Sequence, residues 1–384
     1  MLQVAIVGAG AVAPAHVEAY GKYPELCRVA AICDQNVQRA QELIESTDLD
    51  AQAYGSLREV LNQQHIDAIS ICLPQGLHAE TAIAALQSGK HVLVEKPMAA
   101  SLEECDRMIE AQKESGKILS VISQNRYKIP TMKVKKMLEQ KTGGPVRHAT
   151  VNSLWWRGDS YFNLRWRGVW EREGGGCFTT HAVHHLDVMQ WMLGMPQAVT
   201  AVISNVAHEN SECEDSGVAI FEYPTHLAQF TCNLVTHEEE QEMIFQTESG
   251  RMAIPWRTAA SKELPNGFPV QDTEAIGKLD AQYNAIPELA EEGHTAQIGN
   301  FIKALSGMEP LMIDGPEGRK AVELITGIYK AAVTGTRVEF PISAQDVFYC
   351  KDEMIGQMPR FHEKTHWEEH AKVLPISFGR DVGR

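Results

Sequence analysis

The chain opens with a short apolar run that passes directly into a glycine-rich turn, and this feature constrains the fold more than any other. Residues 3–7 have the composition of a strand, and residues 8–13 follow with the spacing G-x-G-x-x-A. In that spacing the first glycine permits a tight turn, the second lets the backbone approach a pyrophosphate, and the small third residue lets a helix pack on the strand. The turn residues expected to contact a dinucleotide are Gly8, Gly10, Ala11 and Val12.

Strand-like and helix-like segments then alternate over the first third of the chain. Apolar runs predict strands at 28–33, 67–73, 90–94 and 117–122. Helical spacing predicts helices at 36–46, 57–64 and 78–88, and Ser101 with Glu104 has the capping-box spacing of another. This alternation predicts a doubly wound, Rossmann-type parallel sheet over residues 1–124.

An acidic residue, Asp34, directly follows the second predicted strand. A carboxylate at this position accepts hydrogen bonds from both hydroxyls of an adenosine ribose and repels a 2′-phosphate. We therefore expect NAD as the cofactor in preference to NADP.

The tripeptide Glu95-Lys96-Pro97 stands at the end of the predicted strand 90–94. Ligands bind at the carboxyl ends of strands in open parallel sheets. Lys96 can present an ammonium to a substrate hydroxyl or carbonyl, Glu95 can accept hydrogen bonds, and Pro97 fixes the backbone, with a cis peptide as one way to make the turn. The alternative is a solvated ion pair at a strand end.

The alternation stops near Gln124. After a basic helix at 129–140, strand-like segments follow at 146–155, 199–207, 216–223, 227–234, 242–247 and 251–255. Consecutive strands predict a C-terminal α+β domain with a large, mostly antiparallel sheet over residues 125–345, and a tail at 346–384. One face of such a sheet is free for a partner, so we expect a homo-oligomer, a dimer or tetramer. Residues 256–293 are expected to form a long loop.

A second candidate site lies in this domain, where Gly174-Gly175-Gly176 precede a predicted helix. Glycines suit a close backbone approach to a ligand, and Thr179 or Thr180 can cap the helix. Thr180 and His184 are i and i+4 on one helix face. A neutral His184 can take a hydroxyl proton while hydride leaves the substrate carbon. The alternative is a histidine that only packs within the helix.

Aromatic and arginine side chains come before this block. Flat rings pack on sugar faces and an arginine fork suits a carboxylate or phosphate, although any single one can be a core or rim residue. We expect a sugar-like small-molecule substrate. The residues are Trp155, Trp156, Arg157, Tyr161, Arg165, Trp166 and Arg167.

Two histidine patterns contain residue types that can bind a metal ion. His181 and His185 lie near Cys177 and Asp187, but these side chains would spread around the helix. The tail segment 362–366 matches H-E-x-x-H, with His370 four residues on, but its helix would be polar nearly all round. We therefore expect no metal, and a tail that is a solvated arm or a subunit contact.

Together these motifs resemble the glucose-fructose oxidoreductase and inositol dehydrogenase family, Gfo/Idh/MocA, over residues 2 to 345. The resemblance is carried by the glycine turn, Cys72-Leu73-Pro74 followed by His78, the block from Gly89 to Pro97, and the block from Gly174 to Asp187. It implies an NAD(P)-dependent oxidoreductase acting on a secondary alcohol of a sugar, cyclitol or sugar acid. Here the acid/base is His184 paired with Lys96, and the cofactor contacts include Leu73, Pro74, His78, Glu95 and Lys96.

One departure concerns the substrate site implied by the resemblance. The family frequently places an aspartate where this chain has Thr180. A threonine hydroxyl can still bind a substrate hydroxyl, but it cannot act as a carboxylate partner of His184. The expected substrate-binding residues are Lys96, Arg157, Trp166, Arg167, Thr180 and His184.

Composition excludes other broad classes. The net charge of -15 argues against a nucleic-acid or anionic-membrane binder. The eight cysteines are scattered, which suits free thiols in a reducing cytoplasm. No signal peptide precedes the first strand, and no apolar run approaches the roughly 18 residues of a membrane helix. We expect a cytoplasmic protein.

Two alternative functions remain open. A redox-neutral isomerase, epimerase or glycoside-cleaving enzyme would use the same fold and site, with bound NAD reduced and reoxidised in one turnover. A non-catalytic dinucleotide- or sugar-sensing regulatory protein would have no reason to keep both Lys96 and His184.

Overall fold

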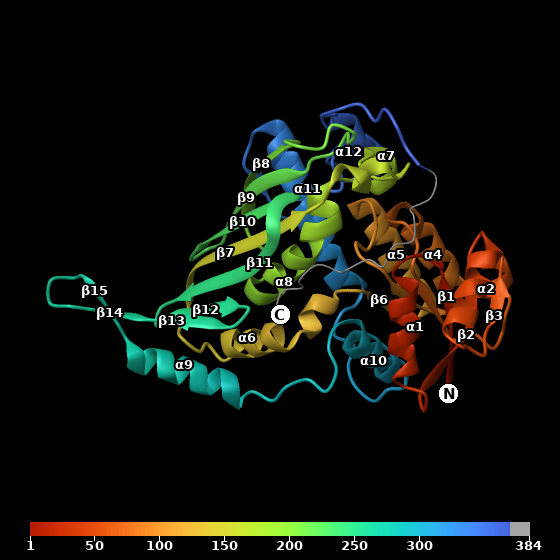
Figure 1. The fold of residues 1–384 in the computed structure, drawn as a ribbon, viewed down its shortest axis with the longest axis horizontal. Coiled ribbons are helices and arrows are strands. Elements are labelled where there is room, and N and C mark those ends of the chain that lie inside the picture. The colour runs from red at the N-terminus through yellow and green to blue at the C-terminus, as the bar shows by residue number, and fades with distance from the viewer. Residues whose placement is uncertain (369–384) are drawn as a thin grey trace.

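The computed structural model describes residues 1–368 and contains two main sheets, a smaller one and a larger one, with helices packed on both (Figure 1). The smaller sheet has the order β3-β2-β1-β4-β5-β6, and all its strands are parallel. The strands are β1 (Leu2–Val7), β2 (Cys27–Cys33), β3 (Gln52–Tyr54), β4 (Ala68–Ile71), β5 (His91–Val94) and β6 (Leu119–Val121). The predicted doubly wound sheet is confirmed.

The connecting helices of this sheet follow the sequence signals closely. They are α1 (Ala13–Gly21), α2 (Val37–Ser46), α3 (Leu57–Leu61), α4 (His78–Gln87) and α5 (Leu102–Ser115). The hydroxyl of Ser101 accepts from the backbone N–H of Glu104 (3.2 Å) and so begins α5, and Gly116 ends it in the left-handed conformation. The strand order reverses between β1 and β4, so the carboxyl ends of these strands form the crevice where ligands bind.

The larger sheet has the order β13-β12-β11-β7-β10-β9-β8-β16, and its neighbours are antiparallel except for β7 and β10. This confirms the mostly antiparallel prediction. The strands are β7 (Val146–Trp156), β8 (Ala198–Ser204), β9 (Ser216–Glu222), β10 (Leu227–Asn233), β11 (Val235–Thr247), β12 (Arg251–Ile254), β13 (Arg257–Ala259) and β16 (Val338–Glu339).

The remaining helices are α6 (Ile129–Glu139), α7 (Trp170–Glu173), α8 (Val183–Leu193), α9 (Thr273–Ala285), α10 (Gly293–Leu305), α11 (Gly315–Thr334) and α12 (Lys351–Gln357). Helices α8 and α11 pack on the larger sheet, and their apolar side chains share its core. Helix α10 packs on α1, and α11 also packs on α5, so C-terminal helices join the two sheets.

The other face of the larger sheet exposes an apolar patch. Val202 of β8 is 70% exposed and lies opposite Val218 of β9. Ile220 and Leu227 extend the patch. Alternate residues of these strands point to the helix-covered core, which is the pattern of a sheet with one covered face.

Two sequence predictions about the C-terminal third were wrong. Residues 256–293 are not one loop: they hold β13, a projecting hairpin of β14 (Ser261–Glu263) and β15 (Pro269–Gln271), and helix α9. Short strands whose residues are exposed carry little apolar periodicity, so the pattern did not indicate them.

The tail is also not a solvated arm in the part that the structure describes. Phe348, Met354 and Met358 are buried in the core beneath the larger sheet. Residues 362–366 are not helical, which removes the helix that the H-E-x-x-H reading needs, and His370 lies outside the described residues.

Within residues 1–368, no helix combines the length and the apolarity that crossing a membrane requires. All eight cysteines are free thiols, as the scattered pattern predicted.

Candidate functional site

The glycine turn lies at the carboxyl end of β1, beside the loop after β4. Gly8 has φ +100°, and a Cβ there would lie 2.4 Å from the carbonyl oxygen of Cys72. A Cβ on Gly10 would meet the same oxygen at an ordinary 3.9 Å. Ala11 is exposed, and α1 begins just after Val12. The backbone therefore has the shape that a dinucleotide-binding turn requires, because only glycine fits at Gly8.

Asp34, directly after β2, has both carboxylate oxygens next to this turn. One accepts from the backbone N–H of Ala9 (2.9 Å) and the other from that of Asn36 (2.9 Å). The guanidinium of Arg39 donates to the carbonyl oxygen of Ala9 (3.1 Å). The carboxylate thus holds the turn itself and remains half-buried at the place expected of a ribose ligand.

The residues after β4 divide into exposed and buried ones. Leu73 is half-buried and Pro74 is exposed beside the glycine turn. His78 is buried, and its two ring nitrogens face the carbonyl oxygens of Leu73 (2.8 Å) and Pro97 (2.9 Å). His78 therefore joins the two loops at the strand ends and is buried between them, and its expected contact with a cofactor stays a prediction.

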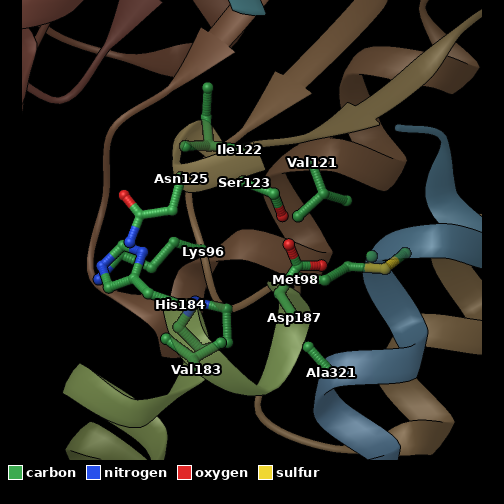
Figure 2. Close-up of a pocket in the computed structure, with 12 residues that line it drawn as sticks. Lys96, Met98, Val121, Ile122, Ser123, Asn125, Val183, His184, Asp187 and Ala321 are labelled. Carbon is green, nitrogen blue, oxygen red and sulfur yellow. The ribbon is translucent and has the colours of Figure 1, made fainter. Parts of the chain in front are cut away.

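Lys96 and His184 line one pocket with Asn125, which follows β6 (Figure 2). The Lys96 ammonium donates to the carbonyl oxygen of Thr180 (3.3 Å), and the peptide between Lys96 and Pro97 is cis, as the sequence suggested. The two sequence-predicted catalytic residues, one after strand β5 and the other on helix α8, therefore line the same pocket. Asn125 carried no motif in the sequence beyond its place after a strand.

Burial sets the protonation of this pair. It lowers the pKa of Lys96, and the neighbouring Glu95 carboxylate acts in the opposite direction. Burial and the charge of Lys96 hold the pKa of His184 well below its usual range. The pocket therefore favours a neutral imidazole on His184, which is a proton acceptor, while the Glu95 carboxylate favours the ammonium form of Lys96 against its burial.

The turn before α8 differs from the predicted capped helix start. Residues Phe178–Ala182 form a π-helical turn, and no side chain caps it. The hydroxyl of Thr180 donates to the carbonyl oxygen of Gly176 (2.8 Å) instead of capping the helix. A π turn inserts an extra residue, which the i and i+4 pattern of Thr180 and His184 could not indicate.

The Glu214 side chain stabilises the second glycine segment, residues 174–176, and the start of the π-helical turn. Its carboxylate accepts from the N–H groups of Gly176 (3.0 Å) and Phe178 (3.1 Å) and from the hydroxyl of Tyr329 (2.8 Å). Burial raises the pKa of Glu214 to about 7, although these hydrogen bonds act in the opposite direction. A Cβ on Gly176 would lie 1.8 Å from the Glu214 carbonyl oxygen, so the glycine is required here.

His181 is a site residue that sequence reasoning considered only as a metal ligand. Its Nδ1 lies 2.7 Å from the Thr180 hydroxyl oxygen, and its ring contacts those of Trp155 and Tyr161. Because that hydroxyl already donates to a carbonyl, Nδ1–H is the donor, which leaves Nε2 as an acceptor. Burial, followed by the charges of two arginines and Lys96, holds the pKa of His181 well below its usual range.

The two arginines are Arg157 and Arg167. Arg157 donates to Glu239 (2.6 Å), and Arg167 donates to Glu173 (2.7 Å). The Arg167 guanidinium lies 4.1 Å from the ring centroids of both Tyr161 and Trp166. Its Nε is buried without a hydrogen-bond partner. A buried unpaired donor costs free energy, so Arg167 is suited to bind an acceptor on a ligand.

The candidate metal ligands on and before α8 do not come together around one point. His185 Nδ1 contacts the Ser153 hydroxyl (2.7 Å) in the core, and Asp187 binds an arginine. Over residues 1–368 the one group close enough to share a cation is His16, Glu95 and His294, whose ligand atoms lie within 4.8 Å of one another. No motif along the chain indicated this group.

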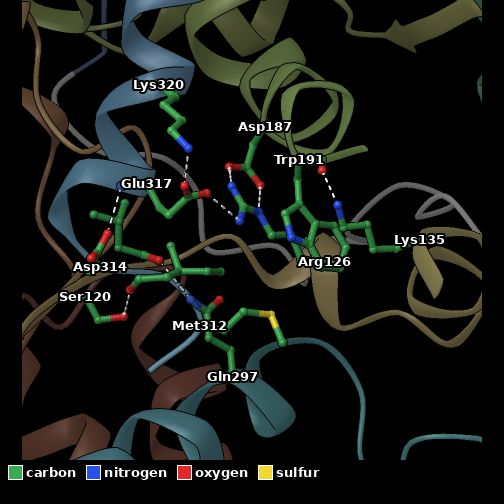
Figure 3. Close-up of polar contacts among 12 residues, drawn as sticks. Ser120, Arg126, Lys135, Asp187, Trp191, Gln297, Met312, Asp314, Glu317 and Lys320 are labelled. Atoms are coloured by element: carbon green, nitrogen blue, oxygen red, sulfur yellow. Dashed lines mark hydrogen bonds and ion pairs between the residues drawn. The ribbon is translucent and has the colours of Figure 1, made fainter. Parts of the chain in front are cut away.

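Asp187 instead fixes the helix that carries His184. It accepts two hydrogen bonds from the fully buried Arg126 (2.8 and 2.7 Å), and Arg126 also donates to Glu317 of α11 (3.0 Å; Figure 3). Lys320 pairs with the same Glu317. This network joins the chain after β6 to α8 and α11.

Comparison with known proteins adds to this geometry. Residues 2–123 match the Gfo/Idh/MocA oxidoreductase family with an NAD-binding Rossmann fold, and residues 131–253 match the C-terminal domain of that family. The structure of the WlbA dehydrogenase from Bordetella pertussis, in complex with NADH and UDP-GlcNAcA, is 30% identical with a TM-score of 0.76, over 89% of this chain and 98% of that chain.

Two curated relatives are similar in sequence. A D-glucoside 3-dehydrogenase of Escherichia coli (strain K12) is 26% identical over 88% of this chain and 97% of that protein. A scyllo-inositol 2-dehydrogenase (NADP(+)) of Bacillus subtilis (strain 168) is 33% identical over 43% of this chain and 45% of that protein.

Proposed function

Because the chain belongs to the Gfo/Idh/MocA family of oxidoreductases, we propose that it transfers a hydride between a nicotinamide cofactor and a secondary alcohol of a sugar, cyclitol or sugar acid. One observation carries the proposal: Lys96 and His184 line the same pocket, beside the strand ends that form the nucleotide crevice. Two related dehydrogenases named for a glucoside and an inositol, and a third in complex with UDP-GlcNAcA, support the substrate class.

The chain's own residues divide the chemistry between them. The nicotinamide, when bound, supplies the hydride acceptor. His184 is held neutral and accepts the hydroxyl proton, and the Lys96 ammonium stabilises the negative charge that develops on the same oxygen. The glycine turn fits a dinucleotide. A side chain at Gly8 would collide with the Cys72 carbonyl oxygen, so only glycine makes this tight turn, and Gly10 leaves the backbone free to approach a pyrophosphate.

NAD is the proposed cofactor. The Asp34 carboxylate beside the turn would repel a 2′-phosphate, which favours NAD. Arg39 lies close to the same loop and would favour the phosphate, so the ratio of the two activities reports which charge prevails.

An acidic sugar is the proposed substrate class, and two arginines near His181 and Lys96 support it. Arg167, with its unpaired Nε, lies over the rings of Tyr161 and Trp166, and Arg157 lies over those of Trp155 and Tyr161. Cations therefore border flat rings that can pack on a sugar. The Bordetella pertussis neighbour is in complex with an acidic sugar nucleotide. Thr180 can bind a hydroxyl of the same substrate.

The apolar patch of Val202, Val218, Ile220 and Leu227 supports assembly into a homo-oligomer through the open face of the larger sheet. Contiguous exposed apolar side chains are typical of subunit contacts. We propose a dimer or tetramer, and light scattering of the purified chain measures which forms.

The test is reduced-nicotinamide absorbance with NAD or NADP and a panel of aldoses, inositols, aldonic acids and uronic acids. Lys96→Ala and His184→Asn should each lower turnover at least about a hundredfold, as expected for loss of a proton-transfer group, with unchanged circular dichroism. The exposed residues Lys113 and His65 provide matched controls, Lys113→Ala and His65→Asn, with unchanged turnover.

The outcomes separate the alternatives. Near-normal activity in either site variant would refute the assignment. Conversion of a sugar without net NADH formation would move the function to redox-neutral chemistry at the same site.

A further inference from the structure

A chain of buried polar side chains leads from α1 through the parallel sheet to Glu95. The Tyr20 hydroxyl donates to the Ser70 hydroxyl oxygen (3.2 Å), which lies 2.8 Å from His16 Nδ1. His16 Nε2 lies 2.9 Å from a Glu95 carboxylate oxygen. Tyr20, Ser70 and His16 are at most 1% exposed. None of the three contacts the catalytic pair described above.

Donor and acceptor roles fix the direction of this chain. Burial lowers the pKa of His16, so its ring is neutral and carries one proton. A bare Nε2 would set two lone pairs against each other at Glu95, so the proton is on Nε2. Nδ1 must then accept, and the Ser70 hydroxyl donates to it while accepting from Tyr20.

Glu95 receives donors on both oxygens. His294 Nε2, from α10, lies 3.3 Å from the oxygen that His16 contacts. The backbone N–H of Lys96 donates to the other oxygen (3.2 Å). Burial disfavours the charged form, but these hydrogen bonds outweigh it and hold the pKa of Glu95 well below its usual range.

We propose that Tyr20, Ser70 and His16 form a positioning relay that fixes the proton of His16 on Nε2, and that the relay thereby keeps Glu95 a carboxylate and Lys96 an ammonium. The inference rests on the proposed role of Lys96. It assigns the three residues no contact with substrate, because they act through Glu95. It also gives the His16, Glu95 and His294 group a function other than metal binding, since the protons on the two Nε2 atoms occupy the positions that a cation would need.

Other charged and titratable groups lie near Glu95 and Lys96. The charge of Arg167 lowers the pKa of Lys96, and the charge of Lys96 in turn lowers the pKa values of His181 and His184. Burial is the largest cause of the shift in all three groups. Among residues 1–368, the titratable and charged groups that interact with Glu95 or Lys96 include His16, Cys72, His78, Arg167, His181, His184 and His294.

The first test is the pH profile of kcat/KM for His16→Leu and His16→Gln. Leucine removes the donor to Glu95. The apparent pKa of the acid limb should therefore rise and that of the basic limb should fall, each by on the order of one pH unit. Glutamine can place its amide N–H near the former Nε2, so its profile should return toward that of the wild type. A role in packing alone would give both variants the same unshifted limbs.

The relay itself is tested by Ser70→Ala and Tyr20→Phe. Both should shift the limbs in the same direction as His16→Leu, by a smaller amount. Ser120→Ala and Tyr127→Phe are the matched controls, because they remove a buried hydrogen bond of the same kind (to Ile313 and Asn300) without touching Glu95. Profiles of Ser70→Ala and Ser120→Ala that coincide would overturn the relay.

A readout without turnover separates this inference from the proposed function. In the full chain labelled with ¹⁵N-histidine, the resonance lost in His16→Gln should be that of a neutral Nε2–H ring that does not titrate between about pH 6 and 9. An Nδ1–H ring, a titrating ring, or stoichiometric metal in the purified protein that is lost in His294→Gln would overturn the proposal, whether or not the wild type oxidises any sugar.

Discussion

Replacing Arg126 by methionine should destabilise the protein strongly, and the structure allows the size of the effect to be worked out. Methionine is flexible and fills much of the arginine's space, so the loss is mainly that of charge and hydrogen bonds. Glu317 keeps Lys320 as a partner after the change. Asp187, which is 3% exposed, loses both of the hydrogen bonds that Arg126 gives it.

The expected loss is about 3–5 kcal/mol in the free energy of unfolding, which is the range for breaking a buried ion pair from one side. Arg107 pairs with Glu80 at 2.6 Å on the surface and provides the control. Arg107→Met should cost only about 0.2–1 kcal/mol, because exposed pairs gain little over hydration. The similar distances in the two pairs make burial the variable under test.

Urea unfolding followed by tryptophan fluorescence measures both variants. The double variant Arg126→Met/Asp187→Leu should recover much of the loss, because it also removes the unpaired carboxylate that the single variant leaves buried. Equal losses in Arg126→Met and Arg107→Met would refute the reasoning, as would a double variant no more stable than Arg126→Met.

Three further predictions concern other parts of the chain. Gly8→Ala should cost about 1–3 kcal/mol of stability through backbone strain and a close contact with a carbonyl oxygen, whereas Gly10→Ala should mainly weaken NADH binding. Urea unfolding and NADH fluorescence compare the two variants, and equal stability of Gly8→Ala and Gly10→Ala would contradict the prediction. Glu214 has a pKa of about 7 when folded and near 4.5 when unfolded. As the pH rises from about 4.5 to about 7, the free energy of unfolding of the wild type should therefore fall relative to that of Glu214→Gln, by at most about 1.4 kcal/mol per pH unit. A difference that does not change with pH would contradict the shift. Val202→Arg should dissociate the proposed oligomer in light scattering and Val206→Arg, outside the patch, should not; equal masses would place the contact elsewhere.

The sequence predicted those parts of the fold that depend on local patterns. The glycine turn, the capping pair before α5 and the apolar runs of the parallel strands all depend on residues close together in the chain. The hairpin of β14 and β15 has no buried face, so periodicity could not reveal it. Phe348 and Met354 pack on residues far away in the sequence, so no local pattern indicated their burial in a tail that was expected to be a solvated arm or a subunit contact.

The candidate site divides in the same way. Lys96 and His184 could be proposed because each follows a local motif that implies a place in the fold. The burial of His78 and the roles of His16 and His181 depend on side chains from other elements, so a pattern along the chain could not reveal them. The π turn before α8 adds a register change that no helical spacing indicates.

The two halves of the proposed chemistry come from different sheets, so the contacts between these units also determine the geometry of the site. Lys96 follows β5 of the parallel sheet, while His184 is carried by α8 on the larger one. The Arg126 network joins the chain after β6 to α8, three residues beyond His184, and to α11. Loss of Arg126 should therefore lower kcat in the fraction of molecules that remain folded, because hydride transfer depends on sub-ångström placement of the reacting groups. Stability and turnover are coupled at this contact, and a variant that lost stability there but kept the wild-type kcat would show that the pocket is held together by other means.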